Sequence, residues 1–285
     1  MKLPVTLVVV LIALLLAGSC NKGPTGGIPF YLKMDTAVVV APPHISASSN
    51  TQEIEDIWVA AGSNNLGAYE LPCLFPVLMQ DSIQFVINPG VWQSGQSATP
   101  VVYPLMNPDV FKIAATPGKT YTHVPTFTYK AGDTIMFNED FEGGSDYNAN
   151  MVSTKDSVKY GIYCGKITVG PNDSLVTACQ QFYYGHNAPY ILTPGQEIWV
   201  ELDYKSDIPF WSGVIAHFND NTTDSIQLLL LLPQTNWTKV YIKLSETVGQ
   251  EGASTYNLYF QGLNPYGYGG GSAYLDNIRL IHLLN

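Results

Sequence analysis

Two groups of carboxylates are the residues of this sequence whose types and spacing could support chemistry. Glu139, Asp140 and Glu142 stand between two phenylalanines in the segment FNEDFEGG, and Glu201 and Asp203 lie two apart in WVELDYKSD. Side chains two apart in a strand point to the same face. Carboxylates grouped in this way can act as a catalytic acid and base, or they can hold a hard metal ion.

The elements that must position these acids are β-strands. The apolar fraction of the chain is 46%, only 13% of residues are charged, and Tyr, Gly and Pro are frequent. Short segments of alternating polarity are separated by Gly, Pro, Asn or Asp, and no stretch keeps a 3.6-residue period with helix caps. The sequence therefore predicts an all-β protein.

The rhythm of the predicted strands changes once along the chain. From residue 54 to about residue 130, short strands recur at the spacing typical of an immunoglobulin-like β-sandwich. From residue 134 the strands are longer, and their order and lengths favour a jelly roll of two facing antiparallel sheets. We expect an immunoglobulin-like β-sandwich at 34–131 and a C-terminal β-jelly-roll sandwich at 132–285.

The N-terminal segment is typical of an exported protein. An apolar run from Val5 to Leu16 has the length of a secretory signal and is too short to span a bilayer comfortably. Small residues then lead to Cys20, and this arrangement resembles the lipobox of bacterial lipoproteins, with Leu16 one place further upstream than usual. The resemblance implies a signal peptide at 1–19, palmitate and other acyl chains on Cys20, a flexible tether at 20–33 and an outer-membrane location. The alternative is an ordinary signal peptide with an incidental cysteine.

Three further cysteines lie in what would be an oxidising compartment. Cys164 and Cys179 could flank neighbouring strands and pair, which would leave Cys73 as a buried apolar thiol. No cysteine spacing is typical of a zinc site.

Two stretches of the chain resemble known families. The segment LGAYELP and its flanking strands resemble a stalk-like sandwich domain of Bacteroidota lipoproteins. The opening FNEDFEGG and the closing AYLDNIRL of the second half resemble jelly-roll carbohydrate-binding modules and related galactose-binding-like domains. That resemblance implies that the first and last strands lie side by side and that acids near them hold one structural calcium. The candidate ligands are Glu139, Glu142 and Asp276; the alternative is that the acids of the first strand only face solvent.

Catalysis by the second carboxylate pair is not expected. Glu201 and Asp203 resemble the start of the Glu-x-Asp-x-x-Glu strand motif of jelly-roll glycosidases, but Ser206 stands where their general acid/base would be. Retaining hydrolysis needs two carboxyl groups about 5 Å apart, so we predict that the protein is not an enzyme. A degenerate or unusual hydrolase is the remaining catalytic alternative.

Two loops of the second half combine aromatic and polar side chains. Loops on a rigid sandwich commonly carry binding sites, and exposed aromatic rings suit sugar rings or a partner protein. The alternative for the glycine-rich loop YGYGGGS is a floppy hairpin, and Trp211 and Trp237 are more often core residues than binding residues. The predicted ligand-binding residues are Tyr183, Tyr184, His186, Tyr266 and Tyr268.

Asp followed by Ser or Thr and an aliphatic residue recurs more often than average composition predicts. The tripeptide resembles the O-glycosylation signal of Bacteroidota envelope proteins, although Asp-Ser/Thr pairs also end turns before strands. The candidate glycosylated residues are Thr36, Ser82, Thr134, Ser157, Ser174 and Ser225.

The net charge of −10, without any cluster of Lys or Arg, argues against nucleic acid as a partner. We predict a lipid-anchored cell-envelope protein that binds a glycan or an adhesion-type partner through its jelly-roll loops, with calcium as its one cofactor. The alternative is a non-catalytic structural or accessory subunit of an outer-membrane protein complex. Which membrane face it occupies stays open.

Overall fold

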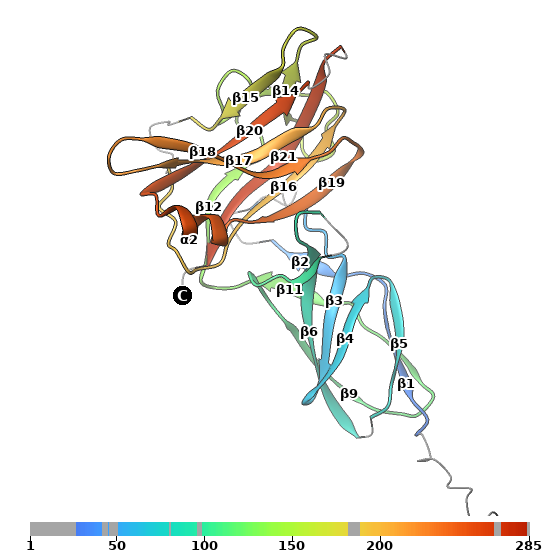
Figure 1. The fold of residues 1–285 in the computed structure, drawn as a ribbon. Coiled ribbons are helices and arrows are strands. Elements are labelled where there is room, and N and C mark those ends of the chain that lie inside the picture. The colour runs from blue at the N-terminus through green and yellow to red at the C-terminus, as the bar shows by residue number, and fades with distance from the viewer. Residues whose placement is uncertain are drawn as a thin grey trace, which may run out of the picture.

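The chain folds into two β-sandwiches, which lie one above the other in Figure 1. The computed structural model describes residues 27–41, 45, 51–79, 81–95, 99–181, 189–264 and 269–283. Almost every described element is a strand, so the predicted all-β fold class is confirmed. Among the described residues, no helix has the length and apolar character needed to cross a membrane.

The first sandwich is built from three small sheets around one core. The five-stranded sheet has the order β4-β3-β6-β7 with β9 also on β6, and the other two sheets have the orders β10-β1-β5 and β2-β11-β8. β1 runs parallel to β10 and β2 runs parallel to β11. The strands are β1 (Phe30–Met34), β2 (Val38–Val40), β3 (Asp56–Ala61), β4 (Asn64–Glu70), β5 (Cys73–Val77), β6 (Ser82–Trp92), β7 (Pro100–Val102), β8 (Met106–Asn107), β9 (Asp109–Ala114), β10 (Thr120–Thr122) and β11 (Thr126–Tyr129).

Strand β1 begins inside the segment expected to be a flexible tether. Phe30, Leu32 and Met34 alternate with exposed or half-exposed neighbours and are fully buried in the core of the first sandwich. Burial of three large apolar side chains stabilises an ordered strand. The expected tether of residues 20–33 is therefore wrong for its last four residues, because the alternation already begins there.

The second sandwich consists of a six-stranded and a four-stranded sheet. The first has the order β13-β14-β21-β16-β19 with β12 on β21, and the second has the order β15-β20-β17-β18. The elements are β12 (Asp133–Glu139), β13 (Val152–Thr154), β14 (Cys164–Val169), β15 (Leu175–Cys179), β16 (Ile198–Ser206), β17 (Phe210–His217), β18 (Thr223–Leu231), β19 (Gln234–Lys243), helix α2 (Ser245–Glu251), β20 (Thr255–Leu263) and β21 (Gly271–Leu283).

The opening and closing strands of the second sandwich lie side by side. β12 pairs antiparallel with β21, from Asp133 opposite Leu283 to Glu139 opposite Ile278. This pairing confirms the arrangement that the resemblance to jelly-roll modules implied. It also places the acids of FNEDFEGG at the end of a strand in the six-stranded sheet.

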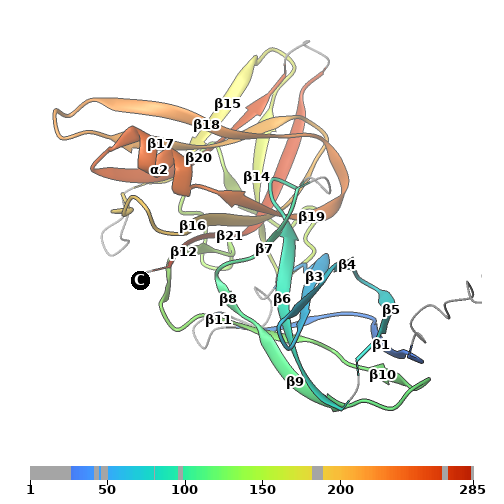
Figure 2. The ribbon, with the colours of Figure 1, turned by 60° about the horizontal axis from the view of Figure 1, so that its bottom comes forward.

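The two sandwiches share apolar packing. In β16, Ile198, Val200 and Leu202 face the core of the second sandwich. Trp199 points the other way and, with Tyr241 of β19 and Ile281 of β21, belongs to the core of the first sandwich. Figure 2 shows β16, β19 and β21 meeting the end of β6 and β7. We call this contact the joint.

The three described cysteines are free thiols. Cys164 lies in the six-stranded sheet, where its Sγ contacts the carbonyl oxygen of Asp156 at 3.3 Å, whereas Cys179 lies in the four-stranded sheet. The pairing of Cys164 with Cys179, which the sequence left open, is not formed in this structure. Cys73 is half-buried in β5, not fully buried as expected.

Candidate functional site

The paired carboxylates of β16 lie in the joint. Glu201 is completely buried and accepts hydrogen bonds from the hydroxyls of Tyr103 and Tyr129 and from Gln52 Nε2, the last at 2.8 Å. Its Oε2 lies 3.5 Å from Arg279 Nη1 and 3.8 Å from Lys239 Nζ. Burial alone would raise the pKa of Glu201, but Lys239 and Arg279 together lower it.

The second carboxylate of β16 is held in the same way. Asp203 Oδ2 accepts hydrogen bonds from the Thr51 hydroxyl and from Asn277 Nδ2, and it lies 3.5 Å from Lys239 Nζ. Ser206, three residues beyond Asp203, accepts a hydrogen bond from the amide of Ile208 at 3.1 Å. Because both acids are buried and their hydrogen bonds and ion pairs are made with protein groups of the two sandwiches, the geometry gives Glu201 and Asp203 a structural role in the joint.

The acids of FNEDFEGG organise their own turn. Glu139 is buried. Its Oε1 accepts a hydrogen bond from the backbone N–H of Phe141 and its Oε2 accepts one from the backbone N–H of Asp146, each at 2.7 Å. Glu142 Oε1 accepts the amides of Ile162 and Tyr163 at 2.7 and 3.0 Å. Burial raises the pKa of Glu139 to about 7, against the two amides that lower it.

The third calcium candidate is the buried Asp276 of β21. Its Oδ1 accepts the amide of Asn277 at 2.8 Å, and its Oδ2 has no hydrogen-bond partner. Burial raises the pKa of Asp276 to about 8, and Asp203, Asp140 and Glu142 add to the rise.

These three acids fit a calcium ion poorly in this geometry. Calcium takes six or more oxygen ligands, whereas backbone amides already occupy both oxygens of Glu139 and Oε1 of Glu142. Within the described ranges, no three His, Cys, Asp or Glu side chains form a group that could hold a metal ion. Calcium binding stays a prediction.

A different surface brings together side chains suited to binding. It is the outer face of the four-stranded sheet, meaning the face turned away from the core of the second sandwich. The registers of β15, β20, β17 and β18 align its side chains in rows across the strands. The rows are Thr177, Gln261, Trp211 and Leu230; Cys179, Tyr259, Gly213 and Gln227; Asn257, Ile215 and Ser225; and Thr255, His217 and Thr223.

The alternation of β20 creates the centre of this face. Tyr256, Leu258 and Phe260 are core residues, so Asn257, Tyr259 and Gln261 must point outward. The local sequence of β20 therefore supplies an amide, a phenol and a second amide at successive rows of the outer face.

Tyr259 forms the floor of the outer face because it lies against Gly213. A Cβ atom at position 213 would lie 2.3 Å from two ring atoms of Tyr259, so only glycine leaves room for the ring. Tyr259 is 3% exposed, and burial, with Cys179 and Asp224 nearby, raises the pKa of its hydroxyl. The ring thus lies against the backbone at Gly213 and is almost completely covered.

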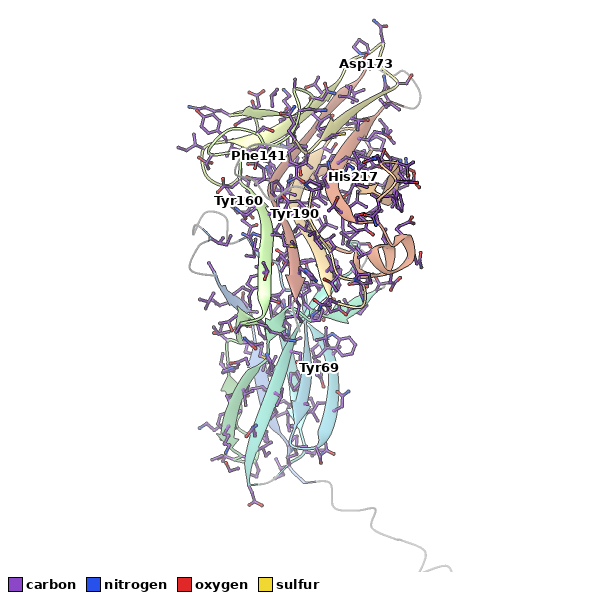
Figure 3. The ribbon with its side chains drawn as sticks, turned by 90° about the vertical axis from the view of Figure 1, so that its left-hand side faces the viewer. Tyr69, Phe141, Tyr160, Asp173, Tyr190 and His217 are labelled. Atoms are coloured by element: carbon purple, nitrogen blue, oxygen red, sulfur yellow. The ribbon has the colours of Figure 1, made fainter. Side chains whose placement is uncertain are left out.

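Half-exposed side chains surround this floor. His217 lies in the second sandwich in Figure 3, and one of its ring nitrogens, Nε2, is 2.6 Å from Asn257 Oδ1. Gln261 Nε2 donates to the Thr177 hydroxyl at 2.8 Å, and the indole of Trp211 lies in the same row. The face therefore offers one half-exposed indole, amide groups, an imidazole and hydroxyls, but no Lys or Arg in these rows.

The predicted ligand-binding residues Tyr183, Tyr184, His186, Tyr266 and Tyr268 lie outside the described residues. The chain leaves β15 through Gln180 and returns at Tyr190, which bridges Tyr256 at the start of β20. The glycine-rich loop instead follows Leu263, at the end of β20. The two loops therefore depart from opposite ends of the outer face.

Sequence reasoning did not single out Tyr259, Asn257 or Gln261 as binding residues. The period-two pattern of TYNLYFQGL was the available signal, together with the alternation of Trp211 and His217 in FWSGVIAH. His217 lies at the end of β17.

The glycosylation candidates differ in exposure. Ser157 is half-buried: its hydroxyl accepts a hydrogen bond from Lys205 Nζ at 2.9 Å, and its carbonyl accepts one from the Trp237 indole. The other five hydroxyl residues are exposed, and they are Thr36, Ser82, Thr134, Ser174 and Ser225. Cys20, the predicted lipidation site, lies outside the described residues.

No protein-family model and no curated protein matches the chain. Among solved structures, the CBM22-1 xylan-binding domain from Paenibacillus barcinonensis is 13% identical, with a TM-score of 0.42 over 55% of this chain and 99% of that domain. A Family 30 carbohydrate binding module is 11% identical, with a TM-score of 0.40 over 55% of this chain and 90% of the module. A structure of carbohydrate-binding modules from the beta-sandwich super family is 14% identical, with a TM-score of 0.37 over 90% of this chain and 99% of that chain. These structural neighbours are carbohydrate-binding modules, and the likeness concerns the β-sandwich fold alone.

Proposed function

We propose that the protein binds a glycan on the outer face of its four-stranded sheet. The observation that carries this proposal is the half-exposed indole of Trp211 beside Gln261, with His217 on the same face and the buried Tyr259 ring over Gly213 supporting it. Sugar rings combine a flat apolar face with a rim of hydroxyls, and they are bound by an aromatic ring flanked by a few placed polar groups. The loops that leave at both ends of the face would add contacts to a longer chain.

The chemistry of the face favours a neutral sugar. Its rows contain amides, hydroxyls and one imidazole, and they contain neither Lys nor Arg. An acidic polysaccharide would also be repelled by the net charge of −10. We therefore expect uncharged polysaccharide fragments to bind better than uronic-acid or sulfated ones.

A glycan array with the whole mature chain tests the proposal. Trp211→Ala should weaken binding to the best neutral glycan at least tenfold, because it removes the half-exposed indole of the face. Trp237→Ala is the matched control, since Trp237 is also half-exposed but lies in β19 of the other sheet. Equal affinity of the Trp211→Ala variant and the unmodified protein would refute the proposed site.

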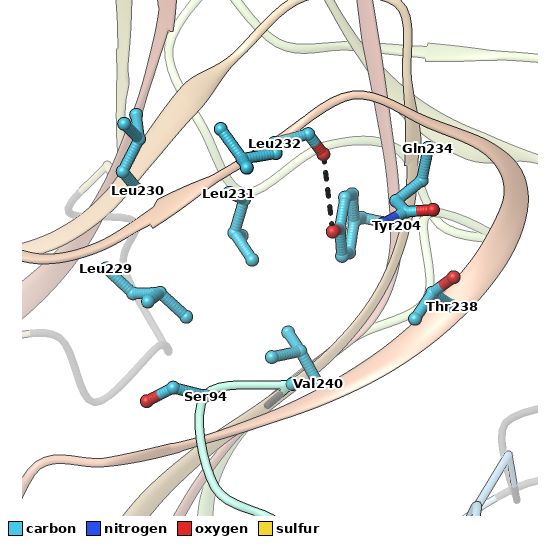
Figure 4. A pocket seen from close by; sticks show the side chains of 10 residues that line it. Ser94, Tyr204, Leu229, Leu230, Leu231, Leu232, Gln234, Thr238 and Val240 are labelled. Carbon is cyan, nitrogen blue, oxygen red and sulfur yellow. Dashed lines mark hydrogen bonds between the residues drawn. The ribbon is translucent and has the colours of Figure 1, made fainter. Parts of the chain in front are cut away.

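A structural or accessory role in an envelope complex is the second candidate function, and the leucine run of β18 favours it. Leu229, Leu230, Leu231 and Leu232 line a pocket of about 190 Å³ with Val240, close to Ser94 of the first sandwich (Figure 4). Leu232 is 60% exposed. A leucine surface of this kind is expected in a protein contact. Cross-linking of the native chain in membranes, compared with a Leu232→Ser variant, tests this role.

A further inference from the structure

A second pocket lies in the first sandwich, away from the outer face described above. It has a volume of about 170 Å³ and is formed where β3, β4, β6 and β7 run side by side. In the strand registers, Asp56 of β3 stands opposite Glu70 of β4 on one side and opposite Gly90 of β6 on the other. The lining residues are Asp56, Ala68, Tyr69, Glu70, Trp92 and Pro100.

The carboxylate of Asp56 is built into this pocket. Trp58 Nε1 donates a hydrogen bond to Asp56 Oδ1 at 3.0 Å. A Cβ atom at position 90 would lie 1.6 Å from Oδ1, so glycine there leaves the space that the carboxylate occupies. The hydrogen bond from Trp58 and the space left at Gly90 thus hold this acid in place.

The other oxygen of this carboxylate lacks a donor. Asp56 is 4% exposed, and its Oδ2 has no hydrogen-bond partner. Leaving a buried carboxylate oxygen unpaired costs free energy, whereas a ligand that donates to it recovers that cost. The unpaired oxygen therefore marks where a hydrogen-bond donor would bind.

The charge around the pocket indicates what kind of donor it is. Glu70 lines the pocket and Glu55 precedes Asp56, while none of these three acids forms an ion pair within the described part of the chain. Burial raises the pKa of Asp56, and Glu70 adds to the rise. Burial also raises the pKa of Glu55, and Glu53, Glu70 and Asp56 add to it. A cation would relieve this repulsion.

Aromatic rings form the remaining walls. Trp92 is half-exposed, and Tyr69, labelled in the first sandwich in Figure 3, stacks on Phe75 with ring centroids 4.0 Å apart. The stacking fixes one face of Tyr69. Aromatic faces beside a carboxylate attract an organic cation through the ring quadrupole while packing against its apolar stem.

We propose that this pocket binds a compact organic ammonium group, with the ammonium at Asp56 Oδ2 and its carbon stem against Trp92 and Tyr69. A lysine side chain and an amino sugar both present this chemistry. The site is independent of the glycan face, because it lies in the other sandwich.

Titration of the whole mature chain with matched pairs of small ligands tests the proposal. The probes are n-butylammonium against n-butanol and glucosamine against glucose, with Nα-acetyl-lysine amide as the peptide-like amine. The readout is the indole N–H signals of Trp58 and Trp92 in NMR spectra. The ammonium probes should shift both signals saturably, and the neutral partners should bind at least tenfold more weakly. Tighter binding of the lysine derivative would assign the pocket to a protein side chain, and tighter binding of glucosamine to an amino sugar.

Variants complete the test. Asp56→Asn should weaken ammonium binding at least tenfold, while Asp109→Asn, on β9 of the same sheet, should leave it unchanged. If Asp56→Asn does not fold, Glu70→Gln replaces an exposed acid and should weaken binding severalfold. Equal binding of butanol and butylammonium, or unchanged affinity in both pocket variants, would overturn the proposal.

Discussion

Asp203 of β16 and Lys239 of β19 stand directly opposite one another in the strand register, with Oδ2 and Nζ 3.5 Å apart and both side chains 1% exposed. Glu201 and Arg279 complete the group, so two acids and two bases are buried where the two sandwiches meet. The burial of Lys239 lowers its pKa, against the two acids that raise it. Removal of one member leaves an uncompensated buried charge.

We therefore expect Lys239→Ala to lower the free energy of unfolding by about 3–5 kcal/mol. Lys243→Ala is the matched control on the same strand, because Lys243 pairs with Glu197 at 3.6 Å at a partly exposed site. Such a pair is worth about 0–1 kcal/mol. Urea unfolding of the two variants measures the difference, and similar losses would show that the joint depends on packing and not on its charges.

Gly213→Ala should disturb the glycan face through Tyr259. The new methyl group would meet the Tyr259 ring, so the ring must move away from the sheet. Overpacking of this kind costs about 1–3 kcal/mol, and glycan affinity should fall with it. Gly249→Ala in α2 is the control: nothing lies within 4 Å of the added carbon, and helix propensity favours alanine. Calorimetry of both variants, with and without glycan, gives the comparison; an unchanged affinity in Gly213→Ala would contradict the role of the ring.

The free energy of unfolding should depend on pH through the titration of the Asp276 carboxyl group. Its pKa is raised by burial from 3.8 to about 8 in the folded chain. Below pH 4 both states hold the proton, and between pH 4 and 8 the unfolded chain releases it while the folded chain does not. The stability contributed by this group is thus lost as the pH rises.

Because one pKa unit corresponds to about 1.4 kcal/mol, Asp276→Asn should remove a decline of about 2 kcal/mol or more between pH 5 and pH 8. Asp220→Asn, at an exposed position, should keep the decline. Denaturant unfolding at several pH values measures both slopes. The same slope in Asp276→Asn and in the unmodified protein would place the titration elsewhere.

We predict that Cys20 carries the lipid anchor. Cys20→Ala should abolish incorporation of labelled palmitate and release the exported protein from the membrane fraction, since acyl chains supply the anchoring free energy. Cys73→Ala keeps the lipobox and should remain anchored. The same distribution of the Cys20→Ala variant and the unmodified protein between fractions, without label in either, would indicate an ordinary signal peptide.

Local pattern was sufficient to predict the strands, whereas the pairing of β12 with β21 was implied by the resemblance to jelly-roll modules. Alternating polarity around Phe137 and Leu280 fixes which faces are buried, and a two-residue period is visible in any strand of adequate length. The seven-residue helix α2 was not predicted, because its segment SETVGQE buries only Val248 and shows no helical period.

The joint and the glycan face could not be located in the same way. Glu201 and Asp203 alternate with core residues as solvent-facing acids would, and only the packing of Gln52, Tyr103 and Tyr129 against them makes them interior. Which sheet keeps an uncovered side depends on where the first sandwich docks. The contact between the two sandwiches joins residues far apart in sequence, so no local periodicity predicts it.

The shared packing at Trp199, Tyr241 and Ile281 has a mechanical consequence. A jelly roll expressed alone from residue 132 would expose an indole and a cluster of desolvated charges to water, so the excised fragment is a poor reagent for ligand screening. In the intact chain, a pulling force on a bound polysaccharide would pass into the first sandwich through these side chains as well as through the short segment that connects β11 to β12. The two sandwiches would then resist bending relative to each other as one rigid unit.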